Sequence, residues 1–338
     1  MGKIVDIKSS PTVAGAAENL AAWPEAYLVY DGQVAPLAGE LIEAVPNIRA
    51  SLGLDISEAG KTMDTVLHIC RFLLDAGASR KALLIALGGG ITSDMAGFAA
   101  CIYKRGIEFA FIPTTLLAQV DAAIGGKTGV NFDDYKNMLG IIRQPVFTLL
   151  SPEPLETLDD RDFRCGVAEM LKTFLIDDAD LYREAVTQLQ HPSADRLQPL
   201  IFAAATIKAD IVSRDPDEHG ERRILNFGHT FAHAIEHEAR TRGDDLAHGE
   251  AVAIGMILAA RLSERLGIAQ KGLAARLKAD FEACGLPVEC PYPLDGLIAA
   301  MARDKKAEGG IIHFILIASP GHIVEKDLAA EEAIRLLS

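Results

Sequence analysis

The chain has few of the features that mark secreted, membrane-spanning or disulfide-stabilised proteins. Its 338 residues include five scattered cysteines and no C-x-x-C pair: Cys70, Cys101, Cys165, Cys284 and Cys290. This pattern argues against a disulfide framework or a thiolate zinc site. No apolar run reaches the roughly 18 residues of a membrane span, and the N-terminus lacks a basic segment followed by a long apolar stretch. We therefore expect a cytoplasmic protein outside the membrane.

Positive charge and aromatic residues are also scarce. Lys and Arg total 33 against 47 Asp and Glu, which gives a formal net charge of −14, and aromatic residues make up 6 % of the chain. An acidic surface is a poor partner for nucleic acids or anionic membranes, so we expect neither. Any anionic small molecule must therefore be met by a local group of cations.

The first part of the chain alternates between apolar strand-like runs and helical patterns. Hydrophobic residues make up 49 % of the chain, as in ordinary globular proteins, and its length suits two domains. The pattern predicts strands at 26–30, 83–87, 109–112 and 146–150, with helices at 62–76 and 95–103. Such alternation predicts a parallel α/β domain over residues 1–150, with ligands at the carboxyl ends of its strands.

The second part of the chain has a different texture. Stretches rich in Ala, Leu and Ile, with charges at helical spacing, dominate after the Pro-rich joint at 151–154. They predict a mainly helical domain over residues 151–338, with helices at 166–176, 197–213, 229–240, 248–266 and 271–284 and a strand at 311–318.

A glycine triplet, Gly88-Gly89-Gly90, follows a predicted strand and opens a predicted helix. Backbone without side chains lets a diphosphate approach amide N–H groups at the positive end of a helix dipole. The triplet does not match G-x-G-x-x-G, because the next glycine is Gly97. Its local pattern fits a dinucleotide site and a tight structural turn equally well.

A second glycine-rich segment, Gly125-Gly126-Lys127-Thr128, resembles an ATPase phosphate loop only in part. That loop needs a glycine at position 121, where this chain has Asp121. What remains is a polar loop that continues into Lys136-Asn137. It fits either a binding loop or a solvated surface turn.

Histidines and carboxylates predict a metal site in the second domain. His229 and His233 stand at i, i+4 on a predicted helix, a spacing that lets two imidazoles share one divalent ion, and His248 opens the next helix. Glu169 lies in an apolar helix start, where it is either turned inward or an exposed first-turn acid.

Single cations are distributed over the same region. Lys172, Lys208 and Arg222 each read as surface residues when taken alone. Together they suit a basic pocket for a substrate that carries phosphate and carboxylate groups.

Several long motifs resemble one known family. They are GGGITSDMAGF at 88–98, PTTLLAQVD at 113–121, GGKTGVN at 125–131, NFGHT at 226–230 and HGEAV at 248–252. In this order and combination they resemble the 3-dehydroquinate synthase family of the sugar phosphate cyclases. The resemblance runs from about residue 31 to 306.

The resemblance implies a reaction and its cofactors. It implies conversion of 3-deoxy-D-arabino-heptulosonate 7-phosphate to 3-dehydroquinate and phosphate in the shikimate pathway, with bound NAD and one divalent metal, usually zinc or cobalt. NAD is reduced and reoxidised within each turnover. The implied steps are oxidation of a ring hydroxyl, β-elimination of phosphate, reduction of the ketone, ring opening and aldol closure. The family also implies a homodimer.

The resemblance further implies roles for individual residues. It makes Glu169, His229 and His248 the metal ligands, and gives His233 a hydrogen-bonding or proton-shuttling role instead. The implied substrate-pocket positions are Asp121, Lys127, Asn137, Lys172, Lys208, Arg222 and Asn226, together with one late lysine, either Lys305 or Lys306. Arg105 matches an arginine that contacts phosphate and comes from a neighbouring subunit. The implied NAD positions are Asp31, Glu58, Lys61, Gly88, Gly89, Gly90, Asp94, Thr114, Thr115 and Lys136.

One departure from the family pattern lies beside the glycine triplet. Members often have glycine just before Asp94, whereas this chain has Ser93, preceded by Thr92. We expect these hydroxyls to act as extra donors close to the diphosphate.

Three other functions would share parts of this pattern. A related cyclase would act on sedoheptulose 7-phosphate or glucose 6-phosphate, and related cyclases tend to differ at Lys208, Asn226 and His233. A metal-dependent polyol dehydrogenase would release NADH and has no use for a basic pocket. A binding module without activity has no need of both a metal cluster and a nucleotide turn.

Overall fold

The computed structural model describes residues 5–133, 135–303 and 311–338 and divides into two compact units. The first unit comprises Met1–Phe163 and Ala194–Pro216, and the second comprises Arg164–Ser193 and Asp217–Ser338. The domain boundary predicted after residue 150 lies 13 residues before Phe163, where the first segment of the first unit ends. The helix predicted at 197–213 was placed with the second domain, but in the structure it packs with the first unit.

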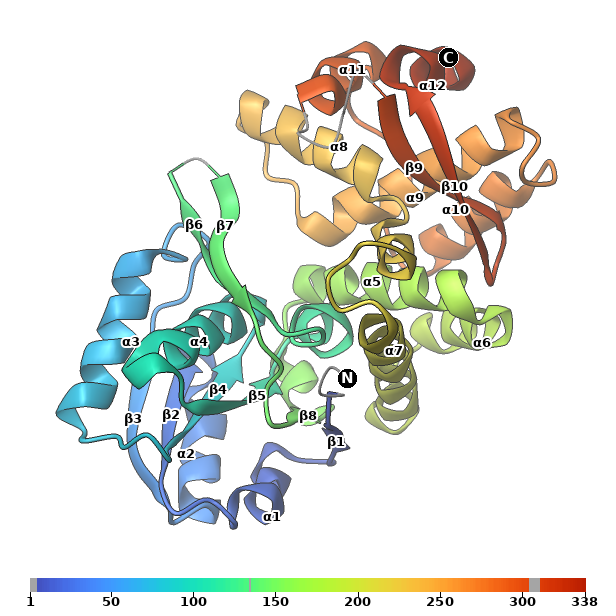
Figure 1. The fold of residues 1–338 in the computed structure, drawn as a ribbon. Helices are drawn as coiled ribbons and strands as arrows, with labels where there is room; N and C mark the ends of the chain where they lie inside the picture. Colours follow the sequence, from blue (N-terminus) through green and yellow to red (C-terminus); the bar gives the residue numbers. More distant parts are fainter. Residues whose placement is uncertain (1–4, 134, 304–310) are drawn as a thin grey trace. The chain divides into compact units, whose positions relative to one another are not determined.

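The first unit is built on a six-stranded sheet in the order β1-β8-β5-β4-β2-β3, in which every neighbouring pair is parallel (Figure 1). This confirms the predicted α/β class. The strands are β1 (Ile7–Ser9), β2 (Ala26–Asp31), β3 (Ile48–Leu54), β4 (Leu83–Gly88), β5 (Glu108–Pro113) and β8 (Thr148–Leu150). Its helices are α1 (Ala17–Leu20), α2 (Ala35–Ala44), α3 (Met63–Asp75), α4 (Gly90–Ile102) and α7 (Ala194–Arg214).

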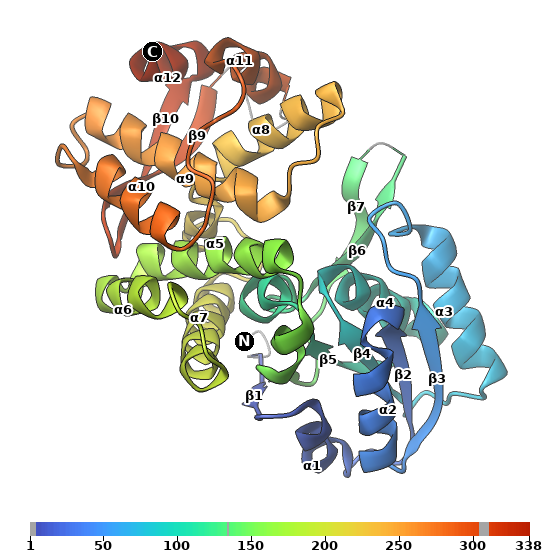
Figure 2. The same ribbon diagram turned by 180° about the vertical axis from the view of Figure 1, so that it is seen from behind.

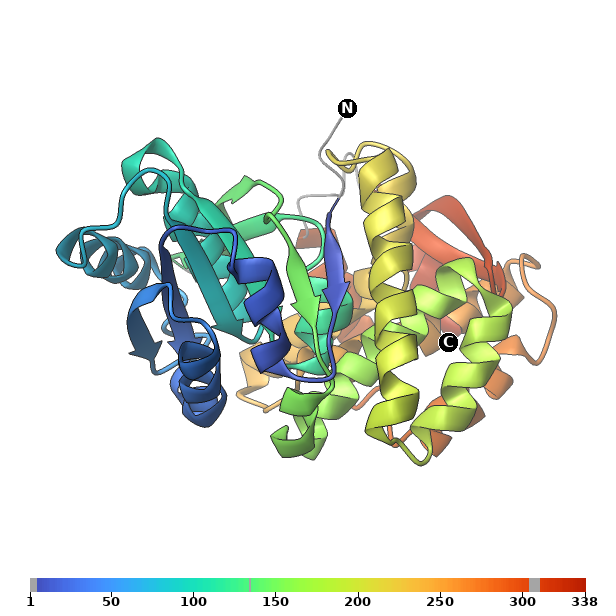
Figure 3. The ribbon, with the colours of Figure 1, turned by 90° about the horizontal axis from the view of Figure 1, so that it is seen from below.

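Alternate residues of the central strands bury into two separate cores. Tyr27 and Val29 of β2 face the core shared with α3 and α4. Ala26 and Leu28 face the opposite core, which α1 and α2 cover. Figure 3 shows helices on both faces of the sheet, with α7 alongside β1 at its edge. Burial on both faces explains why the central strands read as continuous apolar runs in the sequence.

A two-stranded antiparallel ribbon, β6 (Lys127–Phe132) and β7 (Tyr135–Ile142), occupies the segment predicted as a polar loop. Gly129 and Gly140 face each other across the ribbon. A Cβ at Gly140 would lie 2.2 Å from the carbonyl oxygen of Thr128. The two glycines therefore allow the strands to pair closely, although glycines in a sequence usually indicate a loop.

The second unit is mainly helical, as the sequence predicts, and Figure 2 shows its helices around an antiparallel hairpin of β9 and β10. The helices are α5 (Asp160–Asp177), whose first turn lies in the first unit, α6 (Ala179–Leu189), α8 (His229–Arg242), α9 (His248–Arg265), α10 (Leu273–Ala283), α11 (Leu294–Arg303) and α12 (Ala330–Leu337). The hairpin strands are β9 (Ile311–Ser319) and β10 (His322–Ala329).

No helix among the residues that the structure describes is both long and apolar enough to span a membrane.

Candidate metal centre and nucleotide turn

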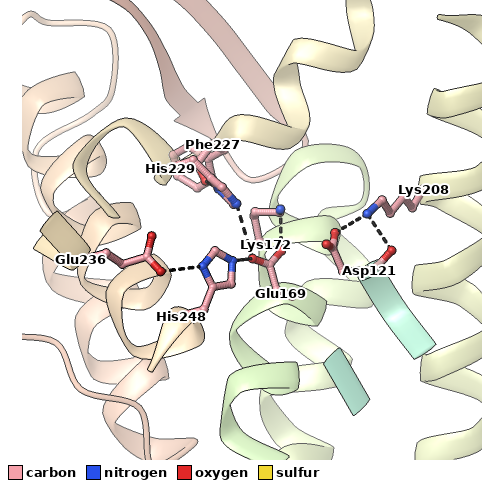
Figure 4. Close-up of polar contacts among 8 residues, drawn as sticks. All are labelled: Asp121, Glu169, Lys172, Lys208, Phe227, His229, Glu236 and His248. Atoms are coloured by element: carbon pink, nitrogen blue, oxygen red, sulfur yellow. Dashed lines mark hydrogen bonds and ion pairs between the residues drawn. The ribbon is translucent and has the colours of Figure 1, made fainter. Parts of the chain in front are cut away.

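Three side chains from three helices of the second unit converge on one point (Figure 4). Glu169 lies in α5, while His229 and His248 are the first residues of α8 and α9. The Nε2 atoms of His229 and His248 lie 3.6 and 3.3 Å from Oε1 of Glu169. One donor atom from each of the three residues lies within 4.8 Å of the others. A carboxylate oxygen and two imidazole nitrogens are a common donor set for zinc and similar divalent metals.

Glycines at helix contacts allow this convergence. Gly228 precedes α8 with a φ of 79°, in the left-handed region that favours glycine. Gly249, the residue after His248, packs so closely on α5 that a Cβ would lie 2.3 Å from the Cα of Cys165. A Cβ at Gly255 would lie 2.3 Å from the carbonyl oxygen of Gly228. The backbones of α5, α8 and α9 therefore approach where the ligands emerge.

Glu169 is fully buried but remains a carboxylate. The ammonium of Lys172, one turn later in α5, lies 2.5 Å from Oε2 and is only 2 % exposed. Burial raises the pKa of Glu169, but Lys172 and the two imidazoles outweigh it and hold that pKa well below its usual range. Neither oxygen makes a well-aligned hydrogen bond within the described part of the chain. Oε1, which faces the two imidazoles rather than Lys172, therefore keeps a lone pair for a cation, and the site fits a divalent metal.

Each histidine has a second contact at its other ring nitrogen. Nδ1 of His229 lies 3.3 Å from the carbonyl oxygen of Phe227, and Nδ1 of His248 lies 3.3 Å from Oε1 of Glu236 (Figure 4). Burial and Lys172 lower the pKa of His229 to about 3, so its imidazole is neutral. Burial also opposes charge on His248, but its close contacts with the carboxylates of Glu169 and Glu236 raise the pKa of this imidazole to about 10. The two carboxylates beside His248 therefore favour a positive charge on this side of the Glu169, His229 and His248 group.

His233 lies beside the three-residue group and is not part of it. Its ring is edge-on to that of His229, with centroids 5.6 Å apart, and its side chain is exposed. The i, i+4 spacing alone favours a shared ion between these two histidines. The structure instead brings the more distant His248 to the carboxylate of Glu169.

The glycine triplet lies at the carboxyl end of β4 and leads directly into α4. Gly88 pairs in register with Pro113 of the neighbouring β5, and its carbonyl accepts a hydrogen bond from the Thr114 amide at 3.0 Å. A Cβ at Gly89 would lie 3.1 Å from Cγ2 of Thr115. The amides of the first turn of α4 and the two threonines therefore share one edge of the sheet, where parallel α/β domains bind nucleotides.

Ser93 and Thr92, which the sequence predicts as extra donors to the diphosphate, are buried in this structure. Both are 1 % exposed, and the Ser93 hydroxyl donates to the carbonyl of Gly89 at 3.2 Å. The side chain of Thr92 lies against Gly88. The two hydroxyls therefore pack inside the turn in this chain.

Lys61 is a buried cation that joins several predicted cofactor residues. Its Nζ lies 2.5 Å from the carboxylate of Asp94 and 2.5 Å from Oδ1 of Asn137. The adjacent Glu58 accepts a hydrogen bond from the side chain of Asn131 at 2.8 Å. Burial raises the pKa of Asp94, and Lys61 opposes that shift. Lys61 thus connects the segment before α3 with helix α4 and with the β6–β7 ribbon.

Asp31 occupies another strand end. It ends β2 and its carboxylate accepts a hydrogen bond from the amide of Gln33 at 3.0 Å. Burial raises the pKa of this carboxyl. Because β2 neighbours β4 in the sheet, Asp31 and the glycine turn lie at adjacent carboxyl ends.

A second ion pair lies in the first unit. Lys208 of α7 donates to the carbonyl oxygen of Asp121 at 2.8 Å and pairs with its carboxylate (Figure 4). Asp121 belongs to a π-helical turn, Ala118–Ala122, whose backbone geometry is often found at functional sites. Lys208 therefore fixes both the turn and its acidic side chain.

The remaining predicted residues are distributed over both units. Arg222 is buried in the second unit, where the side chain of Asn226 donates to Glu218 at 3.0 Å. Lys127 and Lys136 are exposed on the β6–β7 ribbon. Arg105 is exposed in a turn with a φ of 68°. Lys305 and Lys306 lie outside the residues that the structure describes.

Sequence reasoning missed the outer partners of the metal ligands. Glu236 follows His229 by seven residues, two helical turns along the same face of α8. This spacing could have identified Glu236 from the sequence. The carbonyl of Phe227 carried none, because backbone groups have no sequence signature.

A solved structure of similar fold indicates the class of enzyme to which the chain belongs. The fold is similar to 2-epi-5-epi-valiolone synthase from Streptomyces hygroscopicus subsp. jinggangensis, solved with NAD+ and Zn2+ bound, with a TM-score of 0.88 and 30 % identity over 100 % of this chain and 96 % of that one. This similarity over nearly the whole of both chains places the chain among the sugar phosphate cyclases.

Sequence comparison defines the family. The 3-dehydroquinate synthase N-terminal profile matches residues 52–165, and the C-terminal profile matches residues 166–307. The chain is 42 % identical to 3-dehydroquinate synthase from Acidithiobacillus ferrooxidans, over 88 % of this chain and 83 % of the relative. It is 40 % identical to the enzyme from Agrobacterium fabrum, over 92 % and 84 % of the two chains. The chain belongs to the 3-dehydroquinate synthase family.

Proposed function

We propose that the chain catalyses the 3-dehydroquinate synthase reaction, converting 3-deoxy-D-arabino-heptulosonate 7-phosphate into 3-dehydroquinate and phosphate. The observation that carries the proposal is the convergence of Glu169, His229 and His248 in a chain of this family. The cofactors would be NAD and one divalent metal, zinc or cobalt. When bound, NAD supplies a hydride acceptor that is restored in each turnover, and the metal supplies a Lewis acid.

The second unit supplies the metal site of this proposal. Glu169, His229 and His248 would hold the ion, because the donor atoms of the two imidazoles already face the buried carboxylate. Lys172 contacts Glu169 and would add positive charge beside the ligand set, where an anionic substrate gains from it.

The first unit supplies the nucleotide site. The first turn of α4 would bind the diphosphate through backbone N–H groups of the Gly88–Gly90 turn. Lys61 and Asp94 would fix the entry of α4, and Asp31, at the end of β2, is placed to accept hydrogen bonds from a ribose. The remaining proposed contacts are Glu58, Thr114, Thr115 and Lys136. We propose that residues 1–150 bind NAD and that residues 151–338 bind the metal and provide most of the substrate contacts.

The proposed substrate contacts are the cations and amides that suit a phosphorylated sugar acid. Lys208 holds the Asp121 turn, and His233 presents an exposed imidazole next to His229 for hydrogen bonding or proton transfer. The further proposed contacts are Arg105, Lys127, Asn137, Lys172, Arg222, Asn226, Lys305 and Lys306.

A related cyclase activity is the second candidate. The similarity to 2-epi-5-epi-valiolone synthase, at 30 % identity, favours it less than the 42 % identity to a 3-dehydroquinate synthase. Lys208, Asn226 and His233 are all present, in keeping with a substrate that carries a carboxylate. A polyol dehydrogenase does not account for these groups.

We further propose a cytoplasmic homodimer. All five cysteines are free thiols, which suits a reducing compartment. Large apolar side chains are exposed on the β6–β7 ribbon, among them Phe132, Tyr135 and Ile142, and a second copy of the chain would cover them.

The test is a substrate comparison. Purified protein loaded with Zn2+ or Co2+ and NAD is offered each of the three sugar phosphates, and phosphate release is followed. We expect release from the heptulosonate phosphate alone, without accumulation of NADH. Release from sedoheptulose 7-phosphate or glucose 6-phosphate instead would establish the second candidate.

A further inference from the structure

Glu236 contacts a proposed metal ligand without belonging to the ligand group. Its Oε1 lies 3.3 Å from Nδ1 of His248, whose Nε2 faces Glu169 at 3.3 Å. We propose that Glu236 is a positioning residue that orients His248 and strengthens it as a metal ligand. This inference rests on the metal site proposed above.

The position of Glu236 on α8 explains how it reaches His248. It lies two turns after His229 on the same helix, so α8 carries one ligand and the partner of another. The Glu236 side chain is 16 % exposed and faces the ring of His248 from the side opposite Glu169 (Figure 4). Among the described residues, the group of converging donors comprises Glu169, His229 and His248 and leaves Glu236 outside.

The chemistry of the imidazole gives this contact its effect. A carboxylate only accepts hydrogen bonds, so Nδ1 of His248 must carry the hydrogen that it donates to Glu236. When His248 gives up its Nε2 proton to a metal, the lone pair of the ring would then lie on Nε2, the atom that faces Glu169. A hydrogen-bonded carboxylate also fixes the ring plane and makes the imidazole a stronger donor.

The two histidine ligands are supported unequally. Nδ1 of His229 lies against the neutral carbonyl of Phe227, whereas Nδ1 of His248 lies against a charged carboxylate. A charged acceptor forms the stronger hydrogen bond. His248 should therefore depend on its partner side chain in a way that His229 does not.

The experiment measures Co2+ binding by the full-length protein after removal of its metal and reloading. Affinity is obtained by competition with a chelator, and the visible spectrum of bound Co2+ reports the number of ligands. The variants are Glu236→Ala, Glu236→Gln and the matched control Glu238→Gln. Glu238 lies on the same helix but pairs with Arg242 at 3.5 Å, so its variant repeats the charge change away from His248.

We expect Glu236→Ala to weaken Co2+ binding by about 10- to 100-fold, the usual effect of losing such a partner. Glu236→Gln keeps an oxygen acceptor for Nδ1–H and should lose less, while Glu238→Gln should bind as the parent does. At saturating Co2+ the spectrum of each variant should match the parent, because no ligand is lost. Parent-like affinity in both Glu236 variants would overturn the inference, and so would a spectrum showing a lost ligand.

A His248→Ala variant separates this inference from the proposed metal site. If His248→Ala binds Co2+ as tightly as the parent, the metal site itself is wrong. If His248→Ala loses Co2+ while Glu236→Ala keeps parent affinity, the site stands and only the role of Glu236 fails. Thermal unfolding of the metal-free proteins verifies that each variant is folded, and Glu236→Gln, nearly the same shape, remains informative if Glu236→Ala is not.

Discussion

Replacing Gly249 with alanine should damage the proposed metal centre through packing alone. The added Cβ would lie 2.3 Å from the Cα of Cys165 and 2.6 Å from its carbonyl oxygen. Ordinary contacts of this kind begin near 3.4 Å, so α5 and α9 must separate by roughly 1 Å. Both obstructing atoms are backbone, which prevents relief by a rotamer change.

The separation acts directly on two ligands. His248 is the neighbour of Gly249, and Glu169 lies one turn after Cys165 on α5. Metal–ligand distances tolerate deviations of about 0.2 Å, so a shift of roughly 1 Å should weaken metal binding at least tenfold. Overpacking should also lower the free energy of unfolding of the metal-free protein by about 1–3 kcal/mol.

The assay combines urea unfolding of the metal-free protein with chelator competition for Co2+. Gly39→Ala is the control, since Gly39 lies in α2 with no atom within 4 Å of an added Cβ. Alanine there should stabilise the protein by up to about 1 kcal/mol and leave Co2+ affinity unchanged. A Gly249→Ala variant with parent-like stability and Co2+ affinity would refute the packing argument.

Three further predictions concern charged groups and metal ligands. Lys172→Met leaves the buried Glu169 carboxylate without its closest cation and should cost the metal-free protein about 3–5 kcal/mol in urea unfolding; an unchanged midpoint would contradict this. His248→Ala should remove most bound metal, measured by elemental analysis, while His233→Ala retains it, and the reverse pattern would restore the i, i+4 pairing. Lys61→Met should weaken NAD binding by roughly tenfold in calorimetric titration, because a charged hydrogen-bond network at the entry of α4 is lost; parent affinity with reduced stability would make Lys61 purely structural.

Sequence reasoning predicted the central strands and the helices with the strongest periodicity. Strands β2, β4 and β5 are buried on both faces, so their apolar runs are unbroken. The edge strand β3 was missed because it alternates between half-buried and exposed residues and contains Gly53. The β6–β7 ribbon was missed because the glycines that allow its strands to approach are typical of a loop.

Contacts between residues far apart in the chain could not be predicted from local sequence patterns. The chain leaves the first unit after Phe163 and returns with α7, and no composition change marks that return. Lys208 therefore reads as an isolated helical cation, although it pairs with Asp121. Local spacing favoured His233 as the partner of His229, and the resemblance to the family was needed to select His248.

A kinetic measurement on the metal-loaded protein with bound NAD tests the proposed reaction directly. Phosphate release and NADH absorbance are recorded together after addition of 3-deoxy-D-arabino-heptulosonate 7-phosphate. We predict continued release of phosphate with formation of 3-dehydroquinate and no net NADH. Steady accumulation of NADH, or no phosphate from this substrate, would contradict it.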